Sequence, residues 1–115
     1  MMNYQIIELK KLFNELFNKS KLIHNKLMKS TNKSEAISQI DIFELYSSYS
    51  NIKVFFAIET GLQHHELFDT LEAFIAFYNE AKETYIENDR NTSWLDSTFR
   101  IYEECNKAAL LLLNG

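Results

Sequence analysis

The segment Ile52-Lys53-Val54-Phe55-Phe56-Ala57-Ile58 is apolar at six of its seven positions. Successive residues of a helix point about 100° apart, so as a helix this segment would have no polar face. A helix that is apolar on all sides is expected in the middle of a fold or in a subunit contact. Its β-branched and aromatic residues would also suit a buried strand, but no second run of this kind could pair with it, and a lone strand is unstable. The sequence therefore predicts a central helix around Asn51–Glu59.

Composition favours one helical domain. Apolar residues make up 46% of the 115, which suits a buried core and not a disordered chain. Two glycines and no proline are too few for the turns of an all-β or loop-rich domain. The first residues carry no signal-peptide pattern, and the longest apolar run, Ala108–Leu113, is too short to cross a bilayer. With Cys105 as the single cysteine, we expect a cytoplasmic chain without an intrachain disulfide.

Apolar positions recur at alternating spacings of three and four residues and predict four helices. These helices are expected over residues 3 to about 29, 35 to 60, 63 to 88 and 93 to 113. The short connections favour antiparallel neighbours, so we predict an all-α, antiparallel, up-down-up-down four-helix bundle formed by residues 1–115. Five helices are expected if the second breaks near Ser50, because serine and asparagine side chains compete for backbone hydrogen bonds. Asn32 or Ser34 is expected to cap the second helix.

The same spacing predicts which residues face the core. In the first helix they are Ile6, Leu9, Phe13, Leu16, Ser20, Ile23 and Leu27. In the third helix they are Leu67, Leu71, Phe74, Tyr78, Ala81 and Tyr85. In the fourth helix they are Leu95, Thr98, Phe99, Tyr102, Cys105, Ala109 and Leu112.

Histidine and cysteine residues form no convergent site in the sequence. His64 and His65 are adjacent, so on a helix they point apart, and only His65 and Asp69 have a spacing suited to one metal ion. A third ligand is missing, and the Glu-x-x-His spacing of di-iron bundles does not occur. His24 lies at the side of the first core stripe and is expected to pack at the edge of the core. Cys105 falls in a buried stripe without the base that a nucleophile needs.

Other enzyme and ligand classes lack their motifs. The sequence has no Gly-x-Ser-x-Gly turn and no phosphate-binding glycine loop. Helical nucleases of the HEPN type place a histidine four to six residues after an arginine, and neither Arg90 nor Arg100 is followed by one. The seven lysines before Ala36 are scattered and form no basic stripe, so nucleic-acid binding is not expected. A membrane-surface role is not expected either, because the first helix needs its apolar stripe for the core. We therefore expect no enzymatic activity, cofactor or metal.

Acidic residues gather on the far face of the third helix. The net charge of −4 divides into +4 up to Glu35 and −8 from Ala36 onward, so the first helix is expected to lie against acidic neighbours. The far face carries six carboxylates and no cation, whereas an exposed helix usually mixes charges to form pairs three or four residues apart. Such a face is commonly only solvated, but a basic partner would relieve its repulsion and associate faster. We expect the partner-binding residues to be Asp69, Glu72, Glu80, Glu83 and Glu87.

Class and charge together suggest a function by analogy. Small acidic helical proteins include bacterial immunity proteins, antitoxins and phage-encoded inhibitors of defence nucleases. The sequence therefore predicts a non-enzymatic binding protein that neutralises a basic protein partner, of the toxin-immunity, antitoxin or nuclease-inhibitor kind. One alternative is a structural or adaptor domain that acts as a homodimer through surplus apolar surface on the second helix. Another is a small helical enzyme or a metal-binding protein.

Overall fold

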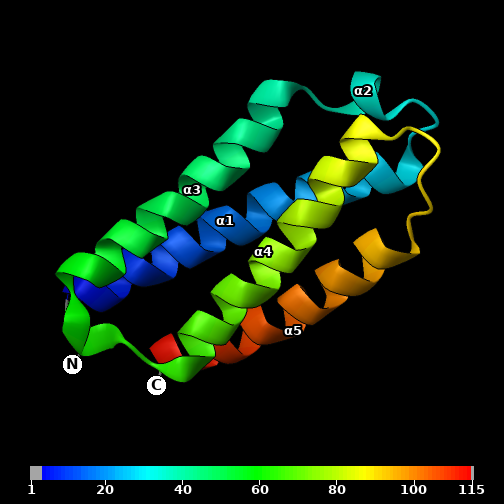
Figure 1. Ribbon diagram of the computed structural model, residues 1–115. Coiled ribbons are helices and arrows are strands. Elements are labelled where there is room, and N and C mark those ends of the chain that lie inside the picture. The colour runs from blue at the N-terminus through cyan, green and yellow to red at the C-terminus, as the bar shows by residue number, and fades with distance from the viewer. Residues whose placement is uncertain (1–3, 115) are drawn as a thin grey trace.

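The computed structural model describes residues 4–114, apart from the side chain of Thr60, and shows a bundle of α-helices (Figure 1). The four long helices are α1 (Tyr4–Lys29), α3 (Gln39–Ile58), α4 (His65–Ile86) and α5 (Ser93–Asn114). A short helix, α2 (Lys33–Ala36), follows α1, and a 3₁₀ turn, η1 (Thr60–Leu62), follows α3. The predicted all-α class and helical bundle are confirmed. Residues 1–3 and 115 of the predicted domain, including the expected start of the first helix at residue 3, lie outside the described residues.

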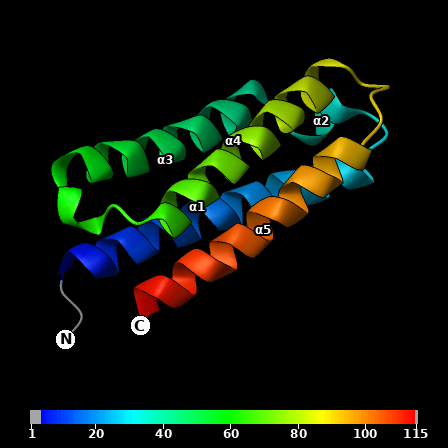
Figure 2. The same cartoon turned by 60° about the horizontal axis from the view of Figure 1, so that its bottom comes forward.

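The long helices lie side by side along a body that is 48 Å long (Figures 1 and 2). The most extensive contact joins α4 to α5, and α1 packs against α3, α4 and α5. Helix α3 contacts α1 and α4 but, within residues 4–114, not α5. Among the long helices of this range α5 likewise contacts only α1 and α4, so α3 and α5 lie at opposite edges of the bundle. No helix in this range is long and apolar enough to cross a membrane.

The core stripe of α1 is the one that the sequence predicts. Its buried residues are Leu9, Phe13, Leu16, Ser20, Ile23, His24 and Leu27, with Ile6 partly buried. Ser20 interrupts the apolar pattern without leaving an unpaired hydroxyl, because its Oγ donates a hydrogen bond to the Leu16 carbonyl at 2.8 Å.

The aromatic centre of the bundle lies between α4 and α5. The ring of Phe74 meets that of Tyr102 edge to face at 5.6 Å, and Phe77 meets Phe99 in the same manner at 5.4 Å. Phe77 is fully buried, whereas the predicted core residues Tyr78 and Tyr85 are partly buried and pack against the edge of the core. Adjacent residues point about 100° apart, and the helix turns the all-carbon ring inward while the hydroxyl-bearing ring stays at the surface.

The predicted stripe of α5 is correct in its first half except for Thr98, which is only half-buried, and it shifts in the second half. Leu95, Phe99, Tyr102 and Ala109 are buried as expected. Further along, Asn106 and Leu113 are buried, while Cys105 is half-buried and Leu112 is 37% exposed. The buried positions follow the helical period of about 3.6 residues, which a polar Asn106 obscured in the sequence.

The predicted break near Ser50 is wrong, because α3 continues without interruption from Gln39 to Ile58. The chain breaks earlier, between α2 and α3, where residue 37 is extended. Ser38 Oγ accepts a hydrogen bond from the Asp41 backbone at 3.2 Å, and the Asp41 carboxylate accepts one from the Ser38 backbone at 2.8 Å. This capping box starts a new helix at that point. Asn32 precedes α2 but makes no side-chain cap, and Ser34 lies inside α2.

The segment Asn51–Glu59 is helical as far as Ile58, but it does not lie in the middle of the fold. Ile52 and Phe56 are 0% and 3% exposed, whereas Val54 is 57% and Ile58 is 72% exposed. Because α3 has long-helix neighbours on only one side, a single stripe of it is covered. Its opposite apolar side remains open.

Candidate protein-binding surface

The histidines at the start of α4 form no metal centre. His64 and His65 are exposed, and His65 Nε2 lies 3.3 Å from Glu66 Oε1. Within residues 4–114, no group of three or more histidine, cysteine, aspartate or glutamate side chains could hold a metal ion. This turn therefore offers one histidine–glutamate contact at a helix start, where an acidic residue is favoured.

His24 is an interior residue that joins α1 to α5. Its ring stacks on Phe99 with the centroids 4.1 Å apart, and its Nε2 lies 3.0 Å from Asp96 Oδ1. Arg100 Nε donates a hydrogen bond to the other carboxylate oxygen at 3.0 Å. This bond, followed by that from His24, holds the pKa of Asp96 below its ordinary value. A histidine–aspartate pair can act as a base, but His24 is only 9% exposed, so packing closes it to a substrate. The sequence predicts His24 at the core edge, and the structure places it deeper, among the buried residues of α1.

Cys105 is held in an unreactive state. Burial raises the pKa of its thiol, and the nearby carboxylates Asp69 and Glu104 raise it further. Only the thiolate is a good nucleophile, so these surroundings oppose covalent chemistry at Cys105. Its carbonyl has a structural role, because it accepts a hydrogen bond from Thr70 Oγ1 at 2.9 Å and so links α5 to α4.

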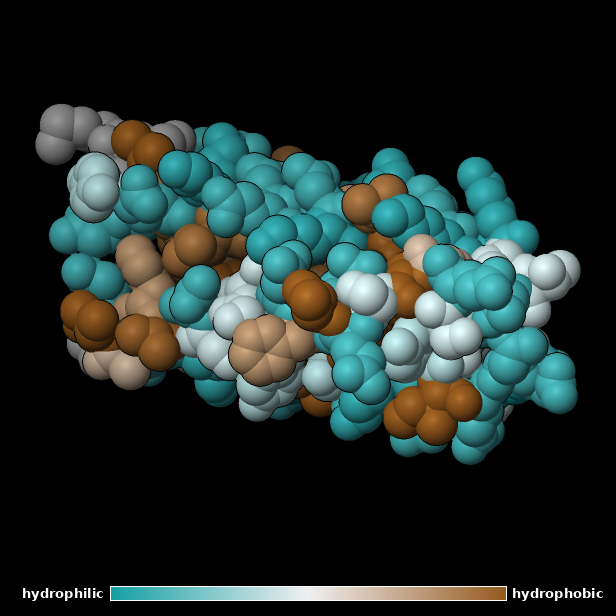
Figure 3. Space-filling view, turned by 90° about the horizontal axis from the view of Figure 1, so that it is seen from above, coloured by the Kyte–Doolittle hydropathy of each residue, from teal (hydrophilic) through white to brown (hydrophobic). Residues whose placement is uncertain are grey.

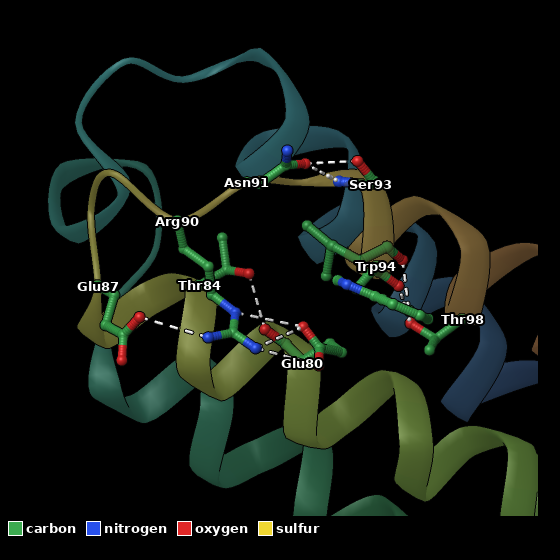
Figure 4. A network of polar contacts seen from close by, with 9 residues as sticks. Glu80, Thr84, Glu87, Arg90, Asn91, Ser93, Trp94 and Thr98 are labelled. Carbon is green, nitrogen blue, oxygen red and sulfur yellow. Dashed lines mark hydrogen bonds and ion pairs between the residues drawn. The ribbon is translucent and has the colours of Figure 1, made fainter.

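The five predicted partner-binding carboxylates do not share one environment. Glu80 and Glu87 are both engaged by Arg90, which folds back from the loop after α4 (Figure 4). The guanidinium nitrogens lie 3.3 Å from each carboxylate. Arg90 therefore brings a cation from the following loop to the acidic face of α4, a face whose own residues supply none. The remaining three carboxylates, Asp69, Glu72 and Glu83, take part in none of the ion pairs found within residues 4–114.

Helix α1 lies beside acidic residues of α3, as expected, but its lysines form no ion pair with them among residues 4–114. Lys19 and Lys26 line a small cavity of about 100 Å³ with Asp41 and Glu44 of α3. Lys19 instead donates a hydrogen bond to Ser48 Oγ at 2.9 Å. The basic and acidic parts of the chain are therefore close in this region without direct contact.

The side of α3 that faces away from the bundle carries large apolar side chains toward both ends and two serines between them, and we call it the outer stripe. Its large side chains are 44–72% exposed. The outer stripe consists of Ile40, Phe43, Tyr46, Ser47, Ser50, Val54, Ala57 and Ile58. At about 100° per residue, Asp41 points away from the outer stripe, whereas Glu44 borders it on one side at about 40° and Lys53 borders it on the other at about 20°. In Figure 3, which views the molecule from above, brown surface lies in several places along the face, from the left to the lower right, with teal and white surface between them.

A shallow groove lies beside the outer stripe, between α3 and α4. Its volume is about 400 Å³, and it is lined by Tyr49, Lys53, Phe68, Leu71, Glu72 and Ile75. At its border the rings of Tyr46 and Tyr78 lie 5.4 Å apart, which joins the groove to the outer stripe. Glu72 therefore belongs both to this groove and to the acidic side of α4.

Sequence reasoning detected surplus apolar surface in the second helix but did not identify the outer stripe. A signal was present in the sequence. Apolar or small residues at 40, 43, 47, 50, 54 and 57 repeat at spacings of three and four, offset from the buried set Ile42, Leu45, Ile52 and Phe56. Two such patterns on one helix indicate two covered faces. Comparison of the chain with protein-family models, curated proteins and solved structures finds no match.

Proposed function

We propose that this protein is a non-enzymatic interaction module that binds another polypeptide through the outer stripe of α3. The observation that carries the proposal is the exposure of five large apolar side chains on one helix face without a charged residue among them. Contiguous apolar patches on small proteins commonly mark interaction sites. Depletion of charge with enrichment of aromatic residues is the compositional sign of an interface core.

The side chains best suited to chemistry support a role in binding over a role in catalysis. His24 is covered by Phe99, and the surroundings of Cys105 disfavour its thiolate. We place the protein in the cytoplasm, where a lone cysteine stays reduced.

Photo-crosslinking in cells tests this proposal directly. The photoreactive residue p-benzoylphenylalanine replaces Phe43 in one variant and Ile101 in another. Ile101 is a matched control, because it is an apolar side chain of α5 that is 59% exposed. We expect one discrete crosslinked species from position 43, none from position 101, and loss of that species when Val54→Glu is added. Equal labelling from both positions, or none from position 43, would refute the proposal.

A second candidate is the acidic side of α4, which we propose as a site for a basic protein such as a toxin or nuclease. Asp69 and Glu72 are exposed and Glu83 is half-buried, and these three carboxylates have no cation partner among residues 4–114. Photo-crosslinking from the exposed Ala76 tests this surface. A basic partner should give a product that weakens with salt, because exposed charge pairs are screened over about 10 Å at 0.1 M salt. A product that salt and Glu72→Lys both leave unchanged would contradict a charge-based contact.

A further inference from the structure

We infer that the occupant of the outer stripe is a second copy of this chain, with the two α3 helices antiparallel about a two-fold axis midway between Ser47 and Ser50. This inference rests on the proposed function, because it names the partner of the same surface. In a two-fold contact the same patch serves both subunits and must be complementary to itself. The outer stripe meets that condition about the midpoint of α3.

Six positions of the outer stripe, 40, 43, 47, 50, 54 and 57, are symmetric about that midpoint, whereas Tyr46 and Ile58 fall opposite Asn51 and Gln39. Phe43 lies four residues after the first residue of α3, and Val54 lies four residues before its last. Ile40 and Ala57 each lie one residue from an end. An antiparallel pair therefore sets Phe43 opposite Val54 of the second copy, and Ile40 opposite its Ala57. Each layer then joins a larger side chain to a smaller one, whereas a parallel pair would set Phe43 against Phe43.

Small residues occupy the crossing point. Ser47 and Ser50 lie at equal distances from the two ends of α3, and no large side chain of the outer stripe lies between them. Helix axes approach to about 8 Å where the contact residues are small. The larger side chains toward both ends then fill the space where two straight helices diverge.

The charges of α3 are compatible with this arrangement. Asp41, Glu44 and Lys53 all lie outside the outer stripe, so none enters the centre of the contact. By the helical rise, the two Glu44 residues would be about 14 Å apart along the axis, and so would the two Lys53 residues. That separation exceeds the screening length of about 8 Å at physiological salt. Antiparallel helices also align their dipoles favourably.

The exposed area is sufficient for a stable contact. Helix α3 has 20 residues and is about 30 Å long. At roughly 100 Å² for each half-exposed large side chain, ten from two copies supply about 1,000 Å², and the intervening small residues add to this. A specific interface needs about 1,000 Å² in total. In the antiparallel pair Glu44 of one copy also lies level with Lys53 of the other, and this charge match together with the area favours a second copy.

Cysteine crosslinking tests the partner and the direction together. All variants carry Cys105→Ser, so each has a single introduced thiol. In the antiparallel pair, two copies of Ser47→Cys place their α-carbons about 5 Å apart along the axis, within the reach of a disulfide, whereas two copies of Phe43→Cys are separated by about 17 Å. Phe43→Cys and Val54→Cys lie at the same level in opposite subunits. Ser97→Cys, at an exposed serine of α5, measures random collision.

Mild oxidation should give a disulfide-linked dimer of twice 13.6 kDa for Ser47→Cys and at least tenfold less for Ser97→Cys. Phe43→Cys and Val54→Cys should each stay monomeric alone and crosslink when mixed. Self-crosslinking of Phe43→Cys as readily as Ser47→Cys would show a parallel pair and overturn the antiparallel arrangement. If every variant matches Ser97→Cys and the native chain sediments as a monomer, the second copy is the wrong occupant. A photo-crosslink from position 43 to another protein would then preserve the proposed function, and the absence of any photo-crosslink would remove both.

Discussion

Replacing one phenylalanine on each side of α3 measures which side supports the fold. Phe56 is 3% exposed and packs against Phe13 and Phe68, with ring centroids 6.4 and 5.1 Å away. Phe43 lies on the same helix and is 71% exposed. Truncation of a buried phenylalanine costs about 3–5 kcal/mol, because transfer energy is lost and a cavity remains. Truncation at an exposed position stays within about 0.5 kcal/mol.

Phe56→Ala should therefore lower the free energy of unfolding by about 3–5 kcal/mol, a large part of a typical total of about 5–15 kcal/mol. Phe43→Ala should leave it almost unchanged at low protein concentration. Urea unfolding followed by circular dichroism measures both values, and equal slopes against urea would show that the unfolded surface is comparable. A repeat at high concentration separates any contribution from self-association. Similar losses for the two variants would show that α3 does not have one covered and one open side.

Three further predictions concern polar groups. Arg100 and then His24 lower the pKa of Asp96, so the contribution of the Asp96 carboxylate to stability is complete above about pH 4–5 and is lost as the pH falls through the pKa of Asp96 in the folded protein. Asp96→Asn should therefore reduce the fall of the urea unfolding midpoint at acid pH, and a pH profile unchanged from the native protein would argue against this network. Because burial raises the pKa of the Cys105 thiol, this thiol should react with a disulfide reagent at pH 7 more slowly than a free thiol does, and the reaction should become faster in urea. Equal reaction rates with and without urea would mean that the thiol is accessible to solvent in the folded protein. Arg90→Ala should cause a small loss of stability that disappears in about 1 M salt, since its contacts are ion pairs near the surface, and a loss that persists in salt would point to packing.

The helical class and the α1 stripe could be predicted because they depend on local information. Period and composition decide whether a chain of this length forms helices, and one strong stripe fixes which side of α1 faces inward. For the adjacent residues Phe77 and Tyr78, the helical period did not show which of the two side chains faces inward. Both are aromatic, so their order of burial depends on the rings of Phe99 and Tyr102 on α5, which lie near Phe77.

The start of α3 shows how two local signals compete. The serines at 47, 48 and 50 weaken a helix in isolation, and their composition favoured a break there. Leu45 and Ile52 on either side are fully buried, so tertiary packing holds the helix through this segment. The capping pair Ser38 and Asp41 was present in the sequence as a start signal three residues apart, and it determined the actual boundary.

The sequence by itself determined that this chain is helical, that it carries more apolar surface on its second long helix than one face can cover, and that acidic residues gather on the next. The tertiary structure alone decided that α3 lies at the edge of the bundle, where its outer stripe is left exposed. It also decided that Arg90 returns to Glu80, ten residues before it, and neutralises part of the acidic side. Both outcomes depend on which surfaces meet when whole helices pack, and that choice is made by the total burial of the bundle and not by the local period of any one segment.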